Sequence, residues 1–223
     1  LICSSENKIV KGDETGVMGK VFFSKNIISN YDDNNLNINF DFDNNGLQNL
    51  EDLVLNQYKQ VGIDTSESFT DKSLENFLYI KILSKIFPKA KFIYCKRNYA
   101  ANLLGILKVF LPNLLWSHSL EKIITFMELY ENHLNEILLE KKIDLKIVNL
   151  ENFSENPLDS SKNLFNFLGI KWNKKIIDEN YKKTTIIKTV SNLQVRNKIT
   201  KHDLSYLENY IPLLKKYGIK NLT

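Results

Sequence analysis

The order of apolar and polar positions along the chain alternates between short runs of strand character and longer runs with helical spacing. The strand-like runs lie at 68–72, 90–95 and 145–150. The helical runs between and after them lie at 74–87, 99–110 and 119–142. Such alternation predicts an α/β protein with a parallel sheet and helices on its faces.

Further helices complete this pattern, and one polar segment interrupts it. The further helices are expected at 17–28 (helical or irregular), 47–61, 157–168, 176–181 and 204–217. Gly62 and Gly169 are expected to end two of them. The stretch 29–46 is rich in Asn and Asp, and we expect a long loop there, near the substrate entrance. The alternative is a solvated insertion without a role.

Length and composition describe a globular protein. The chain has 223 residues, which predicts a single domain over 1–223. Hydrophobic residues make up 43%, charged residues 25% and aromatic residues 11%, so the chain is neither disordered nor a membrane protein. The net charge of +4 comes from Lys residues interleaved with Asp and Glu. We therefore expect no nucleic-acid partner, whereas a small polyanion is compatible with this charge.

Cysteine usage and the chain start bear on location. Cys3 and Cys95 lack CxxC spacing, which indicates a reducing compartment, and we expect a cytoplasmic protein without a zinc site. The longest apolar stretch, 103–116, is too short and too interrupted to span a bilayer. The start LICSSENK has neither signal-peptide character nor a methionine, so we expect the native N-terminus upstream.

Basic residues follow two of the expected strands. Lys72 comes after Asp71 at the first, and Arg97 and Asn98 come after the second. Because the carboxyl ends of parallel strands meet at one edge of a sheet, we expect Lys72 and Arg97 to face one anion. Asn98 is expected to cap the next helix, whose free N–H groups favour that anion. The alternatives are a solvated charge at each corner, or an ion pair of Lys72 with Asp71.

Several blocks of sequence make a family resemblance visible. They are SSENKIVKGDETG, FTDKSLENFLYIKILSKIFPKAKFIYCKRN, VNLENFSENP, LFNFLGIKW and KTVSNLQVRNKI. In order and spacing they resemble sulfotransferases of the type often fused to tetratricopeptide repeats, which are related to tyrosylprotein sulfotransferases. The resemblance covers roughly residues 1–199. It implies an α/β, P-loop-like three-layer sandwich with a central parallel sheet, here lacking its first strand and phosphate loop.

The implied reaction is transfer of a sulfuryl group from 3′-phosphoadenosine 5′-phosphosulfate to an acceptor hydroxyl or amine, with no metal. By the resemblance, Arg97 holds the 3′-phosphate of this nucleotide. Ser191 and Arg196 correspond to residues near the donor phosphates, with Gln194 beside them. The acceptor is a small molecule, a glycan or a protein tyrosine, and an upstream repeat domain is a possible partner.

Two further residues correspond to catalytic positions of the family. Lys72 matches a lysine close to the transferred group, where its charge would offset charge on the leaving phosphate oxygen. Glu14 matches the general base of tyrosylprotein sulfotransferases, which removes the acceptor's proton. Asp13 is a neighbouring carboxylate that competes for this assignment, and an ordinary surface glutamate is the alternative.

The chain departs from the family pattern at several places, and three of them bear on the donor site. Gly105 stands where the family has a serine that contacts the 3′-phosphate, and Asn102 is one candidate to replace it. Leu150 stands where a tyrosine is common. The 5′-phosphosulfate loop of the PRSGTT kind should stand just before Leu1 and does not occur in the chain, and we expect that the chain is a fragment.

Two other functions stay open, the first because of these departures and the second because it shares the expected sheet. One is a catalytically impaired relative that acts as a nucleotide-binding or interaction module. The other is a P-loop nucleotide kinase, which would require a Walker lysine that the chain does not show.

Overall fold

A computed structural model describes the chain in the stretches 1–4, 8–24, 43–109, 111–178 and 199–219. The chain divides into two compact units, and each has a core of its own. The first unit contains residues 1–92 and 129–145, and the second contains residues 93–128 and 146–223. The expectation of a single domain over 1–223 stays a prediction.

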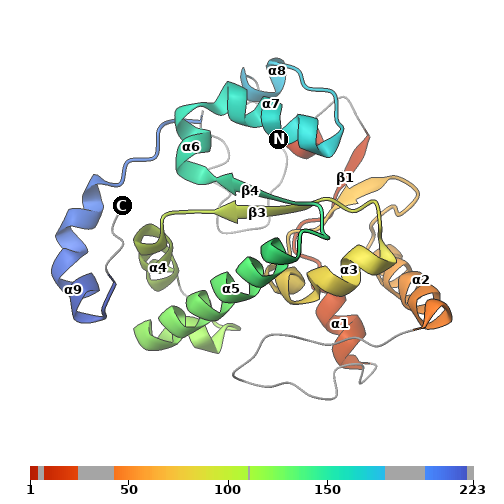
Figure 1. Ribbon diagram of the computed structural model, residues 1–223, viewed down its shortest axis with the longest axis horizontal. Coiled ribbons are helices and arrows are strands. Elements are labelled where there is room, and N and C mark those ends of the chain that lie inside the picture. Colours follow the sequence, from red (N-terminus) through yellow and green to blue (C-terminus); the bar gives the residue numbers. More distant parts are fainter. Residues whose placement is uncertain (5–7, 25–42, 110, 179–198, 220–223) are drawn as a thin grey trace. The chain divides into compact units, whose positions relative to one another are not determined.

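The first unit contains a pair of short parallel strands (Figure 1). Strand β1 (Ile9–Lys11) runs beside β2 (Ser68–Thr70), with Val10 opposite Phe69. The helical elements of this unit are η1 (Ile2–Ser4), α1 (Val17–Ser24), α2 (Asn44–Gln60), η2 (Leu74–Tyr79) and α3 (Ile80–Ile86). Residues 129–140 of α5 (Leu120–Glu140) also belong to it.

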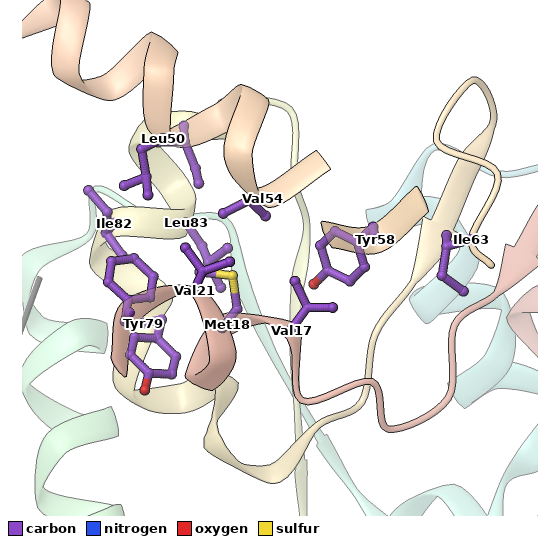
Figure 2. Packing of buried hydrophobic residues seen from close by; sticks show 12 residues of the cluster. Val17, Met18, Val21, Leu50, Val54, Tyr58, Ile63, Tyr79, Ile82 and Leu83 are labelled. Carbon is purple, nitrogen blue, oxygen red and sulfur yellow. The ribbon is translucent and has the colours of Figure 1, made fainter. Parts of the chain in front are cut away.

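The core of the first unit forms between α1, α2 and α3, as Figure 2 shows. Its members from these helices include Val17, Met18, Val21, Leu50, Val54, Tyr58, Ile82 and Leu83. Phe22 and Tyr79 are fully buried and stack with their ring centroids 4.9 Å apart. Val10 and Phe69 pack against the same cluster, so the helices cover the strand pair with apolar side chains.

The second unit contains the other parallel pair, β3 (Phe92–Lys96) and β4 (Leu145–Asn149), except for the first residue of each strand. Its further elements are α4 (Tyr99–Lys108), η3 (Leu115–His118), α6 (Leu150–Glu155), α7 (Pro157–Leu168), α8 (Lys175–Asp178), η7 (Ser205–Tyr210) and α9 (Ile211–Lys216). Its core consists of Ala100, Ala101, Leu103, Leu104, Ile123, Met127, Leu207, Leu214 and Ile219.

Helix boundaries that depend on local capping agree with the sequence. Gly169 closes α7 with a φ of 69°, and Gly62 follows α2 with a φ of 89°. Ser119 precedes α5, and its hydroxyl accepts a hydrogen bond from the N–H of Lys122 at 3.3 Å. These positions follow from contacts within one helical turn.

Several elements differ from the prediction, among them the following two boundaries and one additional strand. The expected helix 74–87 begins as the 3₁₀ turn η2, because the hydroxyl of Ser73 is bonded to Asp71 and Gly16 and does not cap the helix. The expected strand 145–150 ends at Asn149, whose side chain accepts from the N–H of Asn152 and starts α6. Strand β1 was not predicted.

The class of the fold agrees with the expectation, since helices and two small parallel sheets occur together in the described stretches. The three-layer sandwich around one central sheet stays a prediction. Residues 29–42 of the expected loop, with 25–28, 110 and 179–181 of the expected helices, lie outside the described residues. The end of that expected loop is wrong, since residues 44–46 are already part of α2, which Asp43 caps. Within the described part of the chain, no helix is long and apolar enough to cross a membrane.

The core of the first unit predicts the effect of one truncation. Phe22→Ala should lower the free energy of unfolding by about 3–5 kcal/mol, because it removes a fully buried ring and leaves a cavity beside Tyr79. Urea denaturation measures this change. The control Leu139→Ala alters a side chain that is 79% exposed and should stay within about 0.5 kcal/mol of the wild type. Equal effects of the two substitutions would contradict the described core.

Candidate functional site

The turn after β2 is held by the carboxylate of Asp71. The hydroxyls of Thr15 and Tyr58 donate to its Oδ2 at 2.8 and 2.6 Å. The N–H and the hydroxyl of Ser73 donate to its Oδ1 at 2.8 and 2.6 Å. Burial, together with the adjacent carboxylate, raises the pKa of Tyr58 far above its ordinary value, so its hydroxyl stays a donor. Asp71 thus connects the turn to α2 and to the loop after β1.

The loop 12–16, with the sequence GDETG, is bonded to this turn by its backbone as well. The N–H of Lys72 donates to the carbonyl of Asp13 at 2.8 Å. The N–H of Gly16 donates to the hydroxyl of Ser73 at 2.9 Å. Asp13 and Gly16 have φ angles of 51° and 62°, in the left-handed region that a tight loop requires. Both backbone bonds place residue 14 directly beside residue 72.

Gly12 permits the closest approach of this loop to β2. A Cβ atom at position 12 would lie 1.8 Å from the carbonyl oxygen of Thr70, a distance that no side chain tolerates. The absence of a side chain at position 12 is therefore a requirement of the loop's position.

Glu14 and Lys72 form an ion pair at the end of these two loops. The Nζ of Lys72 lies 2.5 Å from Oε1 of Glu14, and the two side chains are 50% and 56% exposed. The alternative pairing of Lys72 with Asp71 is not observed, since Asp71 accepts from Thr15, Tyr58 and Ser73. A carboxylate beside an ammonium group on these hydrogen-bonded loops offers a proton acceptor and a positive charge at one place.

Asp13, the competing carboxylate, is oriented differently from Glu14. Its Oδ1 lies 3.1 Å from the Nζ of Lys11, and the two side chains are about one-third exposed. Of the two neighbouring acids, Glu14 is thus the one that the structure pairs with Lys72.

The turn after β3 belongs to the second unit and is built around Asn98. Its side chain accepts from the N–H of Ala101 at 2.9 Å, which confirms the predicted cap of α4. Its own N–H donates to Oε1 of Glu151 on α6 at 3.0 Å. Because α6 follows β4 directly, this bond connects the carboxyl ends of the two strands of the sheet.

Arg97 lies at this turn and is partly buried. Its Nη2 lies 3.0 Å from Nε2 of His202. Its Nε is buried and has no hydrogen-bond partner among the described residues. A Cβ atom at Gly105 would lie 3.4 Å from its Nη1, so the guanidinium rests against α4 at that position. An unsatisfied buried donor on a cation is what an anion would complete.

The structure brings some of the predicted site residues together. Glu14 and Lys72, from positions 58 apart, are in direct contact in the first unit. Arg97 belongs to the second unit, and its expected position at one edge with Lys72 stays a prediction. Ser191, Gln194 and Arg196 lie outside the described residues.

Two sets of contacts could not be predicted from the sequence. His202 contacts Arg97 across 105 positions, and no short-range pattern signals such a contact. The four bonds to Asp71 were likewise not predicted. Asn102, the candidate to replace the family serine, is exposed on α4.

Among the described residues, no group of three or more His, Cys, Asp or Glu side chains is arranged to hold a metal ion.

Comparison with known proteins gives one family. The model of the sulfotransferase family matches residues 34–174, which is more than half of the chain. The matched range includes Lys72, Arg97 and Gly105, whereas Glu14 lies before it and Ser191 and Arg196 lie after it. No curated protein matches the chain.

The close approach of Gly12 to β2 predicts that alanine at position 12 lowers the stability of the protein, whereas alanine at position 19 does not. Gly12→Ala should lower the free energy of unfolding by about 1–3 kcal/mol, because the methyl group must push the loop away from Thr70. Gly19→Ala in α1 is the matched control, since no atom outside its chain neighbours and its own helix backbone lies within 4 Å of its Cβ position. That change should raise stability by about 0.5–1 kcal/mol. Chemical denaturation of both variants measures the difference, and equal stabilities would exclude the close approach.

Proposed function

The chain belongs to the sulfotransferase family, and from this premise we propose that it transfers a sulfuryl group from 3′-phosphoadenosine 5′-phosphosulfate to an acceptor hydroxyl or amine. The observation that carries the proposal is the family match over 34–174, which contains the turn with Arg97 and the turn with Lys72. The sequence blocks further favour relatives fused to tetratricopeptide repeats or related to tyrosylprotein sulfotransferases.

The proposed holder of the nucleotide's 3′-phosphate is Arg97. Its buried Nε has no partner among the described residues, so a phosphate oxygen would satisfy it. The Cβ position of Gly105 lies 3.4 Å from its Nη1, which supports the correspondence of Gly105 with the family serine. The N-terminus of α4, capped by Asn98, adds N–H groups that favour an anion. Ser191 and Arg196 are proposed to contact the donor phosphates by the resemblance.

The proposed chemistry at the other turn uses Glu14 and Lys72. The acceptor oxygen or nitrogen forms a bond to sulfur, the bond from sulfur to the phosphate oxygen breaks, and the acceptor's proton passes to the Glu14 carboxylate. Lys72 would stabilise the negative charge that develops during transfer. Their ion pair supports this assignment, because it places the acceptor of the proton beside the stabilising charge.

The proposal also includes a cellular location and a class of acceptor. Cys3 and Cys95 are both free and exposed, which supports a reducing, cytoplasmic location. The acceptor classes that fit a hydroxyl or amine nucleophile are small molecules, glycans and protein tyrosines. No metal takes part in the proposed transfer.

One alternative function has a specific observation in its favour. Gly105 has no hydroxyl to offer the 3′-phosphate, and Leu150 opens α6 where the family often has a tyrosine. A relative with such changes would bind the nucleotide without transferring the sulfuryl group. Selective nucleotide binding without turnover on phenols, amines, glycans and tyrosine peptides would favour this alternative.

Removal of the guanidinium tests the binding proposal. Arg97→Ala should weaken binding of adenosine 3′,5′-bisphosphate by about 2 kcal/mol, or about thirtyfold, the scale of a charged hydrogen bond. Binding of adenosine 5′-monophosphate, which lacks the 3′-phosphate, should change little. Calorimetry measures both ligands, and Lys162→Ala on the exposed side of α7 is the control for loss of one positive charge. Unchanged bisphosphate affinity would remove Arg97 from the site.

Neutralising the carboxylate tests the catalytic proposal. Glu14→Gln should lower turnover by about a hundredfold or more, the usual contribution of a general base, and leave bisphosphate affinity unchanged. The loss of an exposed ion pair should cost only about 0–1 kcal/mol of stability, so unfolding does not explain such a result. Glu67→Gln is the matched control, because Glu67 forms a similar pair with Lys8 at 2.6 Å. Equal turnover of the wild type and Glu14→Gln would dismiss Glu14 as the base.

A further inference from the structure

The contact between Arg97 and His202 determines where the proton of the imidazole lies. Nη2 of Arg97 and Nε2 of His202 are 3.0 Å apart. A guanidinium group has only donors and keeps its charge in proteins, so Nε2 must be the acceptor. His202 is therefore the neutral tautomer with its hydrogen on Nδ1 when it occupies this position.

His202 is fixed at this place by its backbone. Its N–H donates to the hydroxyl of Ser154 on α6 at 3.1 Å. That hydroxyl in turn donates to the carbonyl of Glu151 at 2.8 Å. Glu151 is also the residue that accepts from the N–H of Asn98, next to Arg97. The same helix thus positions both the arginine turn and the histidine.

The described charged groups around His202 come from the turn after β3, from α6 and from its own segment. They are Arg97, Glu151, Glu155, Lys201 and Asp203. Each of the three carboxylates accepts a hydrogen bond or ion pair from another group: Glu151 from Asn98, Glu155 from Lys201 at 2.7 Å, and Asp203 from Ser205. Arg97 is the charged group whose side chain contacts the imidazole directly.

We propose that His202 is a second ligand of the phosphate bound by Arg97, and that phosphate binding is coupled to uptake of one proton by His202. The inference rests on the proposed function, and it names the group that replaces the hydroxyl missing at Gly105. Without an anion, protonation would place two cations 3.0 Å apart, which is unfavourable. A phosphate oxygen between them removes this repulsion and accepts from both. The proton comes from solvent and binds Nε2, which changes from acceptor to donor.

Calorimetry with adenosine 3′,5′-bisphosphate near pH 6, 7 and 8, in buffers of low and high ionisation enthalpy, tests this coupling. One linked proton changes an affinity by at most about tenfold per pH unit. From pH 6 to pH 8 the wild type should lose at least about threefold more affinity than His202→Asn. It should also take up on the order of half a proton more near pH 7. The phosphate's own ionisation, with a pKa of about 6, is common to both proteins and cancels in the comparison.

The control is His118→Asn, in the same unit, whose Nε2 contacts the carbonyl of Leu111 and not Arg97. It should show the wild-type pH profile and proton uptake. A second measurement uses only the wild type and so does not depend on the folding of a variant. In NMR spectra, the ring ¹⁵N signals of His202 should report the Nδ1–H tautomer without ligand and the imidazolium with bisphosphate.

The outcomes distinguish a failure of the proposed function from a failure of the proton coupling at His202. If the wild type does not prefer the bisphosphate over adenosine 5′-monophosphate, both the proposed function and this inference fail. If it does prefer the bisphosphate, but His202→Asn keeps the wild-type pH profile or the ring signals show no protonation, the coupling alone is overturned. Preference together with the reduced slope and protonated ring supports both.

Discussion

The carboxylate of Asp71 is the constraint on which the geometry of the first unit depends. It accepts four hydrogen bonds, from Thr15, Tyr58 and Ser73, which belong to three separate parts of the chain. A partly buried carboxylate is stable only when its oxygens are satisfied, so these donors and Asp71 require one another. Because Tyr58 also lies in the apolar core, the polar turn and the hydrophobic packing are parts of one arrangement.

This arrangement explains why Glu14 and Lys72 meet. An ion pair between two half-exposed side chains contributes little free energy and does not hold two loops together. The ion pair is instead a consequence of the loop positions. The hydrogen bonds between the backbone of the loop 12–16 and the turn after β2 set the positions of both side chains. Residues whose backbone is held in place by hydrogen bonds lose less entropy when a reaction requires their geometry.

The second unit uses the same principle with different residues. Asn98 and Asn149 cap the helices that follow β3 and β4, and Glu151 connects the two turns through the N–H of Asn98. Arg97 stands at this junction with a buried donor for which no partner is described, and His202 reaches it from a distant part of the chain. His202 thus contacts a guanidinium that also lies next to α4 at Gly105.

The sequence by itself determined the features that depend on near neighbours. The cap at Asn98, the glycine that closes α7 and the amphipathic course of α5 follow from contacts within one or two turns of helix, and the motif blocks identified the family and pointed to Arg97 and Lys72. Only the tertiary structure decided the partner of Lys72, the role of Asp71 and the contact of His202 with Arg97. Apart from Ser73, which is two positions from Asp71, these partners lie between 13 and 105 positions away. A hydrogen bond over such a distance depends on how the chain packs and not on any local preference.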